Sequence, residues 1–355
     1  MRYRFPLCFA AGLAVASTAQ AGCNLATVAN IPIHVENGRI FVSGKIDTHR
    51  VDFLVDPSSP SILLRSAAVE FGIYPDKMRS LQERAYLGVG PNGENAAIAV
   101  DHLPMHIGGV IANFGSSQEV AVLGMDYLAN FDVEIDVEHG LMNLYQPTGC
   151  ESIGLAYWTR NFSSADMVAN TSNIINQAPY SKYSYPHINF RVSVNGRELL
   201  AAFDPGIAMT ALSFAAADPL GVGAGSETAP TPDLLDGYEI RTWLGSFGTI
   251  ALGRETAGPV KIGLRTLELP IGATTNNTGS LIDRFGQTGE NLLHTHPRPE
   301  AQDGKDMVIG ADFLLAHRVY IAYSQNKIYF TPIAGKPYLG AVPSLAAKTA
   351  GTGSP

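Results

Sequence analysis

Short apolar runs and apolar–polar alternations, separated by turn residues, cover most of the chain and favour β-strands over long helices. The two clearest runs are residues 51–55 and 199–203. Each is followed by an aspartate, Asp56 or Asp204, and then by a proline-containing turn. Apolar runs of this length bounded by turns are typical of buried strands. The sequence therefore predicts two buried strands, each carrying one carboxylate into a tight turn.

The two runs belong to a longer internal repeat. Residues 42–56 align without gaps to residues 190–204, and residues 122–145 align without gaps to residues 308–331. Because similar segments recur in the same order, the sequence indicates two structural copies within one chain. We therefore expect a mainly β protein built from two similar lobes with short helices.

A short helix is expected after each aspartate, at residues 66–72 and 213–221, since a glycine stands at the end of each segment. The second copy is longer than the first, and most of the additional residues lie at 272–305. This stretch is rich in Thr, Asn, Gly and Pro. It is predicted to be a surface insertion whose role the sequence does not indicate.

The start of the chain has the pattern of a secretory signal peptide. A basic start is followed by an apolar stretch and by Ala19-Gln20-Ala21, an A-x-A cleavage signal. Together with the repeat, this predicts five consecutive segments. They are a signal peptide at 1–21, a first lobe at 22–158, a linker at 159–185, a second lobe at 186–338 and a flexible tail at 339–355.

Composition narrows the class of protein. The chain has 355 residues, of which 46% are hydrophobic and 16% charged, so it is long and apolar enough for two folded domains. The net charge of -8 and the lack of a basic stripe argue against a nucleic-acid partner. No run after the signal peptide is long enough for a membrane span.

The cysteines agree with export. Cys8 lies in the signal peptide, which leaves Cys23 and Cys150 as a pair, and an even pair in an exported protein predicts a disulfide. A lipid anchor on Cys23 is the alternative, although Gln20 stands where such anchors usually have Leu. We expect a periplasmic or secreted protein.

Two motifs, each present twice, resemble a known family. They are an aspartate turn after an apolar strand and a later apolar-apolar-Gly before a short helix, at residues 53–56 with 122–124 and at residues 202–204 with 308–310. This order resembles the half-domain of the retropepsin-like aspartic proteases. The similarity covers residues 31–147 and 186–332, and it implies two retropepsin-like β-barrel lobes in a pepsin-like bilobal arrangement. Residues 144–150, 155–158 and 310–320 resemble, more narrowly, exported bacterial proteins that carry two such halves.

The resemblance implies a chemistry for Asp56 and Asp204. Two carboxyl groups within hydrogen-bond reach share one proton, so one can take a proton from water while the other donates to a peptide carbonyl. The expected function is an aspartic-type endopeptidase that acts on a peptide or protein substrate, with no cofactor and no metal. Because one chain supplies both carboxylates, a monomer is compatible with this site.

The family's triplet is Asp-Thr-Gly or Asp-Ser-Gly, and this chain departs from it in both copies. Pro57 and Pro205 replace the hydroxyl residue that in the family bonds across to the other half, and Ser58 replaces one glycine. These changes support an alternative hypothesis, a catalytically degenerate pseudo-protease that binds peptide or envelope ligands in the inter-lobe cleft. A β protein without protease ancestry is a third possibility.

Three further patterns have structural explanations. Asp126 and Asp312 follow the glycine of each copy and are expected to cap the next helix. Residues 88–93 match G-x-G-x-x-G, but no helical pattern follows, which favours a loop over a dinucleotide site. His294 and His296 lie in the insertion without a nearby Cys, Asp or Glu cluster, so we expect no metal there.

Overall fold

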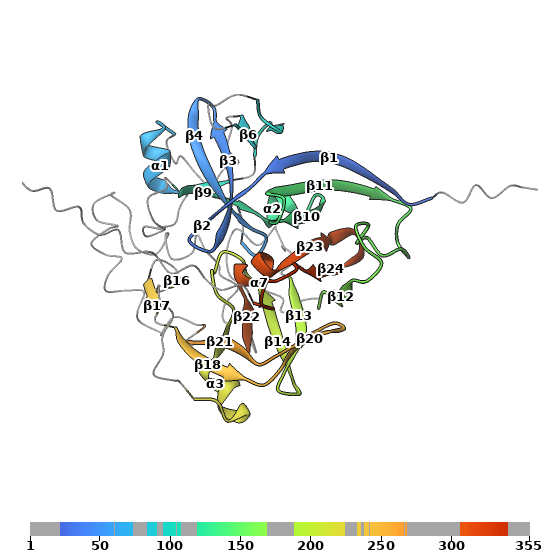
Figure 1. Ribbon diagram of the computed structural model, residues 1–355. Helices are drawn as coiled ribbons and strands as arrows, with labels where there is room; N and C mark the ends of the chain where they lie inside the picture. Colours follow the sequence, from blue (N-terminus) through green and yellow to red (C-terminus); the bar gives the residue numbers. More distant parts are fainter. Residues whose placement is uncertain are drawn as a thin grey trace, which may run out of the picture.

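The computed structural model shows two β lobes joined by a third sheet, which confirms the mainly β, two-lobed fold (Figure 1). The residues that it describes are 22–59, 61–73, 84–90, 95–103, 105–107, 119–168, 188–223, 233–235, 238–240, 242–265, 267 and 306–339. The predicted signal peptide, the 272–305 insertion, nearly all of the predicted tail and much of the predicted linker lie outside these residues.

The first lobe is a sheet built around the hairpin that ends in Asp56. Its strands, in spatial order, are β7 (Ile98–Val100), β6 (Ala85–Leu87), β3 (Arg39–Ile46), β4 (His49–Asp56), β9 (Glu119–Gly124), β5 (Ile62–Leu63) and β8 (His106–Ile107), with β2 (His34–Glu36) beside β3. The central strands β3, β4 and β9 carry the apolar runs, and most of their residues are buried.

The second lobe has the same plan around the strand that leads to Asp204. Its strands, in spatial order, are β18 (Trp243–Phe247), β21 (Val260–Arg265), β15 (Ala211–Ser213), β22 (Met307–Ile309), β14 (Arg197–Phe203), β13 (Asn189–Val194), β19 (Ile250–Leu252) and β20 (Glu255–Ala257). A separate hairpin joins β16 (Asp233–Leu235) to β17 (Tyr238–Ile240).

Strand pairing confirms the internal repeat. In the first lobe β4 runs parallel to β9, β5 runs antiparallel to β9, and β5 runs parallel to β8. The second lobe has the same three pairings. There β14 runs parallel to β22, β15 runs antiparallel to β22, and β15 runs parallel to β21. The repeat therefore extends from the sequence to the topology, and it places Asp56 and Asp204 at equivalent ends of equivalent strands.

Short helices follow each repeated strand. They are α1 (Arg65–Glu70), α2 (Met125–Leu128), α3 (Phe214–Ala217), η2 (Asp218–Leu220) and α7 (Ala311–Ala316). Gly72 and Gly221, expected to end the helices after the aspartates, both have a φ of 70°. Glycine adopts this left-handed conformation without steric cost, which explains why the chain leaves the helix at these residues.

The third sheet is shared by both copies. Its strands, in spatial order, are β1 (Asn24–Pro32), β11 (Leu141–Thr148), β10 (Asp132–Asp136), β23 (His317–Ala322), β24 (Lys327–Pro332) and β12 (Ser163–Asp166), with η3 (Tyr323–Gln325) between β23 and β24. The antiparallel pairing of β10 with β23 is the junction between the copies. Because β12 lies at 163–166, part of the segment expected to be a linker is a strand of this sheet.

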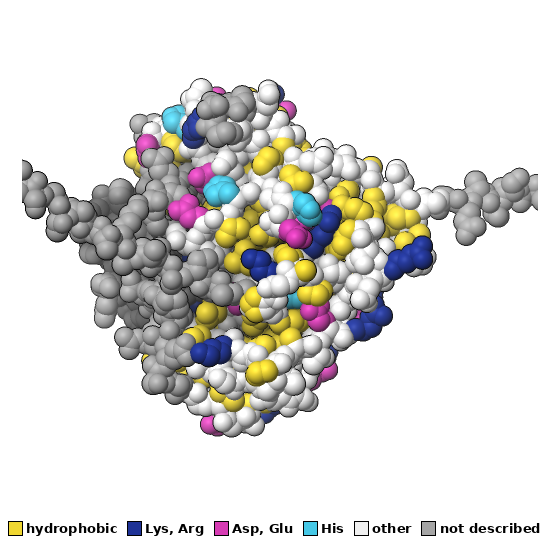
Figure 2. Space-filling view, viewed as in Figure 1, with side chains coloured by type: hydrophobic (Ala, Val, Ile, Leu, Met, Phe, Trp, Pro, Cys, Tyr) yellow, Lys and Arg dark blue, Asp and Glu magenta, His cyan; other side chains and the backbone are white. Residues whose placement is uncertain are grey.

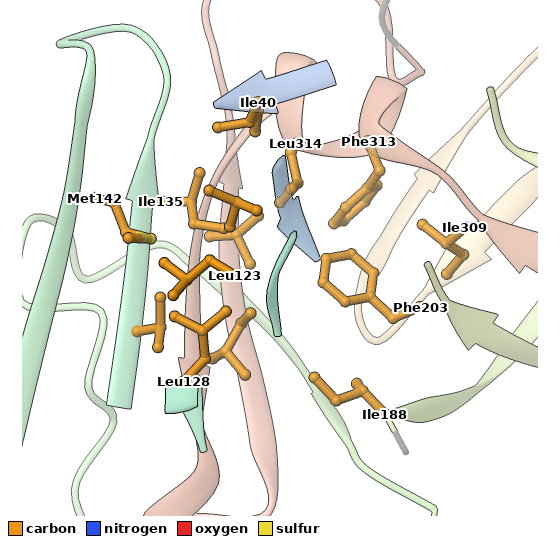
Figure 3. Close-up of a cluster of buried hydrophobic side chains, with 14 of the residues drawn as sticks. Ile40, Leu123, Leu128, Ile135, Met142, Ile188, Phe203, Ile309, Phe313 and Leu314 are labelled. Atoms are coloured by element: carbon orange, nitrogen blue, oxygen red, sulfur yellow. The ribbon is translucent and has the colours of Figure 1, made fainter. Parts of the chain in front are cut away.

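A continuous apolar core crosses the junction. Figure 3 shows Leu123 and Ile135 of the first copy beside Phe313 and Leu314 of the second, and one buried cluster contains residues of both lobes and of the shared sheet. Figure 2 shows apolar side chains across the middle of one face, where the lobes meet, with charged side chains scattered around them. Since a large apolar junction resists domain motion, the two aspartate turns are held in a fixed relation.

The expected disulfide joins Cys23 to Cys150, with their Cα atoms 4.5 Å apart and 127 positions between them in sequence. It ties the start of β1 to the segment just after β11. A disulfide that closes so long a loop stabilises the fold mainly by restricting the unfolded chain. Among the residues that the structure describes, none of the helices has the length and apolar character that crossing a membrane requires.

An ion pair also joins the two copies within the shared sheet. The Nε of Arg318 on β23 donates to Glu134 Oε1 at 2.7 Å, and its Nη1 lies 3.0 Å from Asp136 Oδ2. Glu134 is fully buried on β10. Its other oxygen, Oε2, accepts hydrogen bonds from Asn143, Tyr145 and Tyr157. The carboxylate is therefore satisfied only while Arg318 stays in place.

Arg318→Ala is expected to lower the free energy of unfolding by about 3–5 kcal/mol, because it leaves the buried charge of Glu134 without its cation. Arg191→Ala is the matched control. Arg191 pairs with Glu198, but both side chains are more than half exposed, so the expected loss is below about 1 kcal/mol. Urea unfolding of both variants measures the difference. Equal effects would show that the Arg318 pair does not hold the copies together.

Candidate functional site

Asp56 and Asp204 lie side by side where the two lobes meet. Gly206, in the turn after Asp204, shows how close they are. A Cβ atom added to Gly206 would lie 2.6 Å from Asp56 Oδ2 and 3.3 Å from Asp204 Oδ1. These two oxygens are therefore within about 6 Å of each other, the range in which like charges shift each other's pKa. The structure thus brings together the two carboxylates that the sequence singled out.

Equivalent backbone contacts hold the two turns. Asp56 is paired with Gly124 of the parallel strand β9, and the N–H of Asp204 donates to Ile309 of β22 at 2.9 Å. Three residues after each aspartate, the carbonyl of Ser59 or Ile207 accepts a hydrogen bond from the first residue of the helix that follows the parallel partner strand, α2 or α7. Each carboxylate is therefore fixed to the rigid centre of its lobe by strand pairing and by a helix start.

The environment of Asp56 stabilises both of its oxygens. Oδ1 accepts hydrogen bonds from the N–H of Ser58 at 2.9 Å and from its hydroxyl at 2.6 Å. Oδ2 accepts from the hydroxyl of Ser59 at 2.8 Å. The serine that replaces glycine at position 58 therefore adds a donor to the carboxylate. Sequence analysis did not assign Ser59, although a hydroxyl three residues after a buried aspartate is a local signal that could have identified it.

Burial and the negative charge of Asp204 raise the pKa of Asp56 to about 6, and the donors of Ser58 and Ser59 offset part of this rise. Both causes act in the same direction, because burial and a like charge each disfavour the ionised form. A carboxyl group with this pKa keeps its proton in mildly acidic solution, where an ordinary aspartate is ionised.

The two aspartates have different surroundings. Asp56 is buried, whereas Asp204 is partly exposed. The residue three positions after Asp204 is Ile207, which has no hydroxyl where the first copy has Ser59. The fold is therefore symmetric, but the burial of the two aspartates and the residues three positions after them differ between the lobes.

Asp126 and Asp312 support the two turns. The N–H and the hydroxyl of Ser61 both donate to Asp126 Oδ1, and Thr210 donates to Asp312 through its N–H at 2.9 Å and its hydroxyl at 2.6 Å. Each aspartate also accepts a hydrogen bond from the next N–H of its own helix. The expectation that they cap the helices is wrong, because the N-cap positions are Gly124 and Gly310 and both aspartates lie inside the first turn. Each instead fixes the chain that follows the candidate catalytic aspartate of its lobe.

A contact between the lobes reaches the second turn. The side chain of Arg39, which begins β3 in the first lobe, donates through Nε to the carbonyl oxygen of Gly206 at 2.9 Å. Arg39 is 5% exposed. Sequence analysis did not identify it, because the two residues are 167 positions apart and only the packing of the lobes brings them together.

The remaining candidate motifs add no chemistry within the described residues. Residues 91–94 lie outside the described residues. The strands on either side, β6 and β7, pair with each other, whereas a dinucleotide site requires a strand followed by a helix. The described part of the chain contains no group of three or more His, Cys, Asp or Glu side chains that could hold a metal ion. His294 and His296 lie outside it.

Comparisons with known proteins give structural similarity only. No family model and no curated protein matches the sequence. An aspartic proteinase from Irpex lacteus is similar in structure, with 10% identity, 88% of this chain and 98% of that chain covered and a TM-score of 0.43. Basic 7S globulin from soybean has 9% identity, 87% and 95% coverage and a TM-score of 0.41. A retropepsin-like aspartic protease from Rickettsia conorii has 17% identity, 36% and 96% coverage and a TM-score of 0.22.

Proposed function

We propose that the chain is an aspartic-type endopeptidase that hydrolyses peptide bonds with Asp56 and Asp204. The observation that carries this proposal is the approach of the two carboxylates, one from each copy of the repeat, close to the same point at Gly206. In the proposed site the two carboxyl groups share one proton between them, and this supplies an acid and a base at the same time.

The difference between the two environments assigns the roles in the free enzyme. Asp56 is the acid, because burial and the charge of Asp204 raise its pKa to about 6. Asp204 is the base and takes a proton from a water molecule as the water oxygen attacks the peptide carbonyl carbon. Asp56 gives its proton to the carbonyl oxygen, which forms a tetrahedral diol. Asp204, which now holds the proton from water, gives it to the amide nitrogen, and Asp56 takes a proton back from a diol hydroxyl as the C–N bond breaks. The products are a carboxylic acid and an amine, and the pair again holds one proton.

Export and a monomeric site belong to the same proposal. The disulfide between Cys23 and Cys150 is typical of oxidising compartments, and the start of the sequence has the pattern of a signal peptide. Because both aspartate turns come from one chain, the proposed site needs no second copy. The proposed substrate is an unfolded protein or a peptide.

The pH dependence of cleavage tests the function. Purified protein is expected to cut an unfolded protein substrate best at acid pH, with kcat/KM falling as the pH rises above about 6. Above that pH Asp56 loses the proton that the reaction needs. The profile is measured from about pH 3 to pH 8, with and without a pepstatin-type transition-state mimic, which is expected to block cleavage. Activity that increases towards neutral pH and resists the mimic would contradict the proposal.

The alternative is a pseudo-protease that binds peptides without cutting them. The specific observation in its favour is Pro57 and Pro205, which remove a hydroxyl from both turns. Calorimetric binding of a pepstatin-type peptide distinguishes the two functions. Binding together with cleavage supports the endopeptidase, whereas binding without cleavage at any pH supports the pseudo-protease.

A further inference from the structure

Arg39 has the most unusual position among the buried charges that the proposed reaction does not use. It begins β3, and two residues after it Phe41 pairs with Leu54 of β4. Continuing the antiparallel register of β3 and β4 by two residues sets Arg39 opposite Asp56. The backbone of Arg39 therefore lies beside the first aspartate turn. Its guanidinium reaches the second aspartate turn, where it donates a hydrogen bond to the carbonyl oxygen of Gly206. Its side chain therefore spans the space between the two turns.

We propose that Arg39 is a positioning residue that holds the Asp204-Pro205-Gly206 turn against the first lobe, in place of the hydroxyl contacts that Pro57 and Pro205 cannot make. This inference rests on the proposed function of the aspartate pair. Two like charges that face each other repel, and proline offers neither an N–H nor a hydroxyl to oppose the repulsion. A donor anchored in one lobe and bonded to the turn of the other keeps the carboxylates close.

Arginine suits this role better than a neutral donor. Its guanidinium stays charged at every relevant pH and is weakly hydrated for a cation, so burial costs it less than it costs lysine. A charged donor also makes a stronger hydrogen bond to a carbonyl than a neutral donor does. The contact reaches Gly206, where an added Cβ would lie close to both carboxylates, so a shift of this turn changes the distance between Asp56 and Asp204.

The test is the titration of Asp56, followed by carboxyl ¹³C NMR in the wild type and in Arg39→Met. If Arg39 holds the turns together, its loss separates and hydrates the pair, and the pKa of Asp56 falls from about 6 towards 3.8. If Arg39 were only a nearby positive charge, its removal would raise this pKa instead. A rise or an unchanged value in the folded variant would overturn the proposal.

The activity of the same variants gives a second readout. Arg39→Met is expected to lower kcat by about 10²-fold with a smaller change in KM, because misplacement of catalytic groups affects the chemical step more than substrate binding. Adding Pro57→Thr and Pro205→Thr to this variant is expected to recover activity, since the new hydroxyls supply the missing contacts. If kcat is unchanged in Arg39→Met, or the added hydroxyls recover nothing, the proposal fails.

Arg318→Ala is the control for general weakening of the junction. Arg318 joins the copies through the shared sheet and is expected to lower stability without changing the titration of Asp56. If Arg39→Met does not fold, Arg39→Lys takes its place, because it keeps the charge but not the planar donor. A lower kcat and a lower pKa of Asp56 support the proposal, and wild-type values overturn it. A wild type that cuts nothing refutes the endopeptidase, and the titration still decides the role of Arg39.

Discussion

Asp204→Asn is expected to lower kcat for peptide hydrolysis by about 10³-fold or more, while the fold is kept. Asparagine has nearly the shape of aspartate but cannot take a proton from water at any working pH. Asp204 is partly exposed at the meeting of the lobes, so the amide needs no new buried partner. The measurement is kcat and KM on an unfolded protein substrate at acid pH, with circular dichroism to show that the variant is folded.

Asp166→Asn is the matched control for this variant. Asp166 lies on β12, pairs with Lys327, and has a side chain that is 78% exposed. This variant makes the same substitution of aspartate by asparagine, but in the shared sheet. We expect it to have wild-type kcat and KM. Full activity in Asp204→Asn, with the control equally active, would mean that the second aspartate is not the base.

Gly206→Ala is expected to reduce kcat by about 10²-fold or more, through a different physical effect. Its methyl group would lie 2.6 Å from Asp56 Oδ2 and 3.3 Å from Asp204 Oδ1. The first distance is below any ordinary carbon–oxygen contact, so the turn or the carboxylate has to move. The φ of Gly206 is outside the left-handed region, so its lack of a side chain matters for space and not for backbone conformation.

Gly223→Ala controls for the loss of a glycine in a turn. A Cβ at Gly223 would meet no atom of the described residues within 4 Å, so this variant is expected to keep wild-type activity and stability. Kinetics of both variants, together with their thermal midpoints, separate the two outcomes. A fully active Gly206→Ala would show that the space between the two carboxylates is not where the substrate carbonyl and the attacking water react.

The sequence predicted the pair of aspartates because a repeat has two equivalent places for every feature. An apolar run before Asp56 recurs before Asp204, and both aspartates follow equivalent strands. The parallel partners of these strands were also predictable, since each carries the apolar-apolar-Gly motif at the expected distance. Local pattern and strand pairing therefore specify the positions of the two carboxylates.

The contacts between the copies could not be predicted in this way. The hydrogen bond from Arg39 to Gly206 and the pair between Arg318 and Glu134 depend on how the lobes pack, which no local pattern encodes. The strand β12 is another example. Its sequence, Ser163-Ser164-Ala165-Asp166, lacks apolar alternation, and it becomes a strand because β24 offers it an edge.

The edge strand β1 of the shared sheet could also be predicted only in part from the sequence. The similarity to the protease family covers the first copy only from residue 31 onwards, but β1 begins at Asn24. Its first residues are largely exposed, and they pair with β11 next to the disulfide of Cys23 and Cys150. Tertiary pairing here extends a strand beyond the part that its own sequence favours.

The titration of Asp56 tests the central claim most directly, because it measures whether the two carboxylates act as a pair. Carboxyl ¹³C NMR of the wild type is expected to give a pKa of about 6 for Asp56. In Asp204→Asn the pKa is expected to fall, since the negative charge of Asp204 is removed, and to stay above 3.8 because the side chain remains buried. A wild-type pKa near 3.8, or the same pKa in both proteins, would contradict the account.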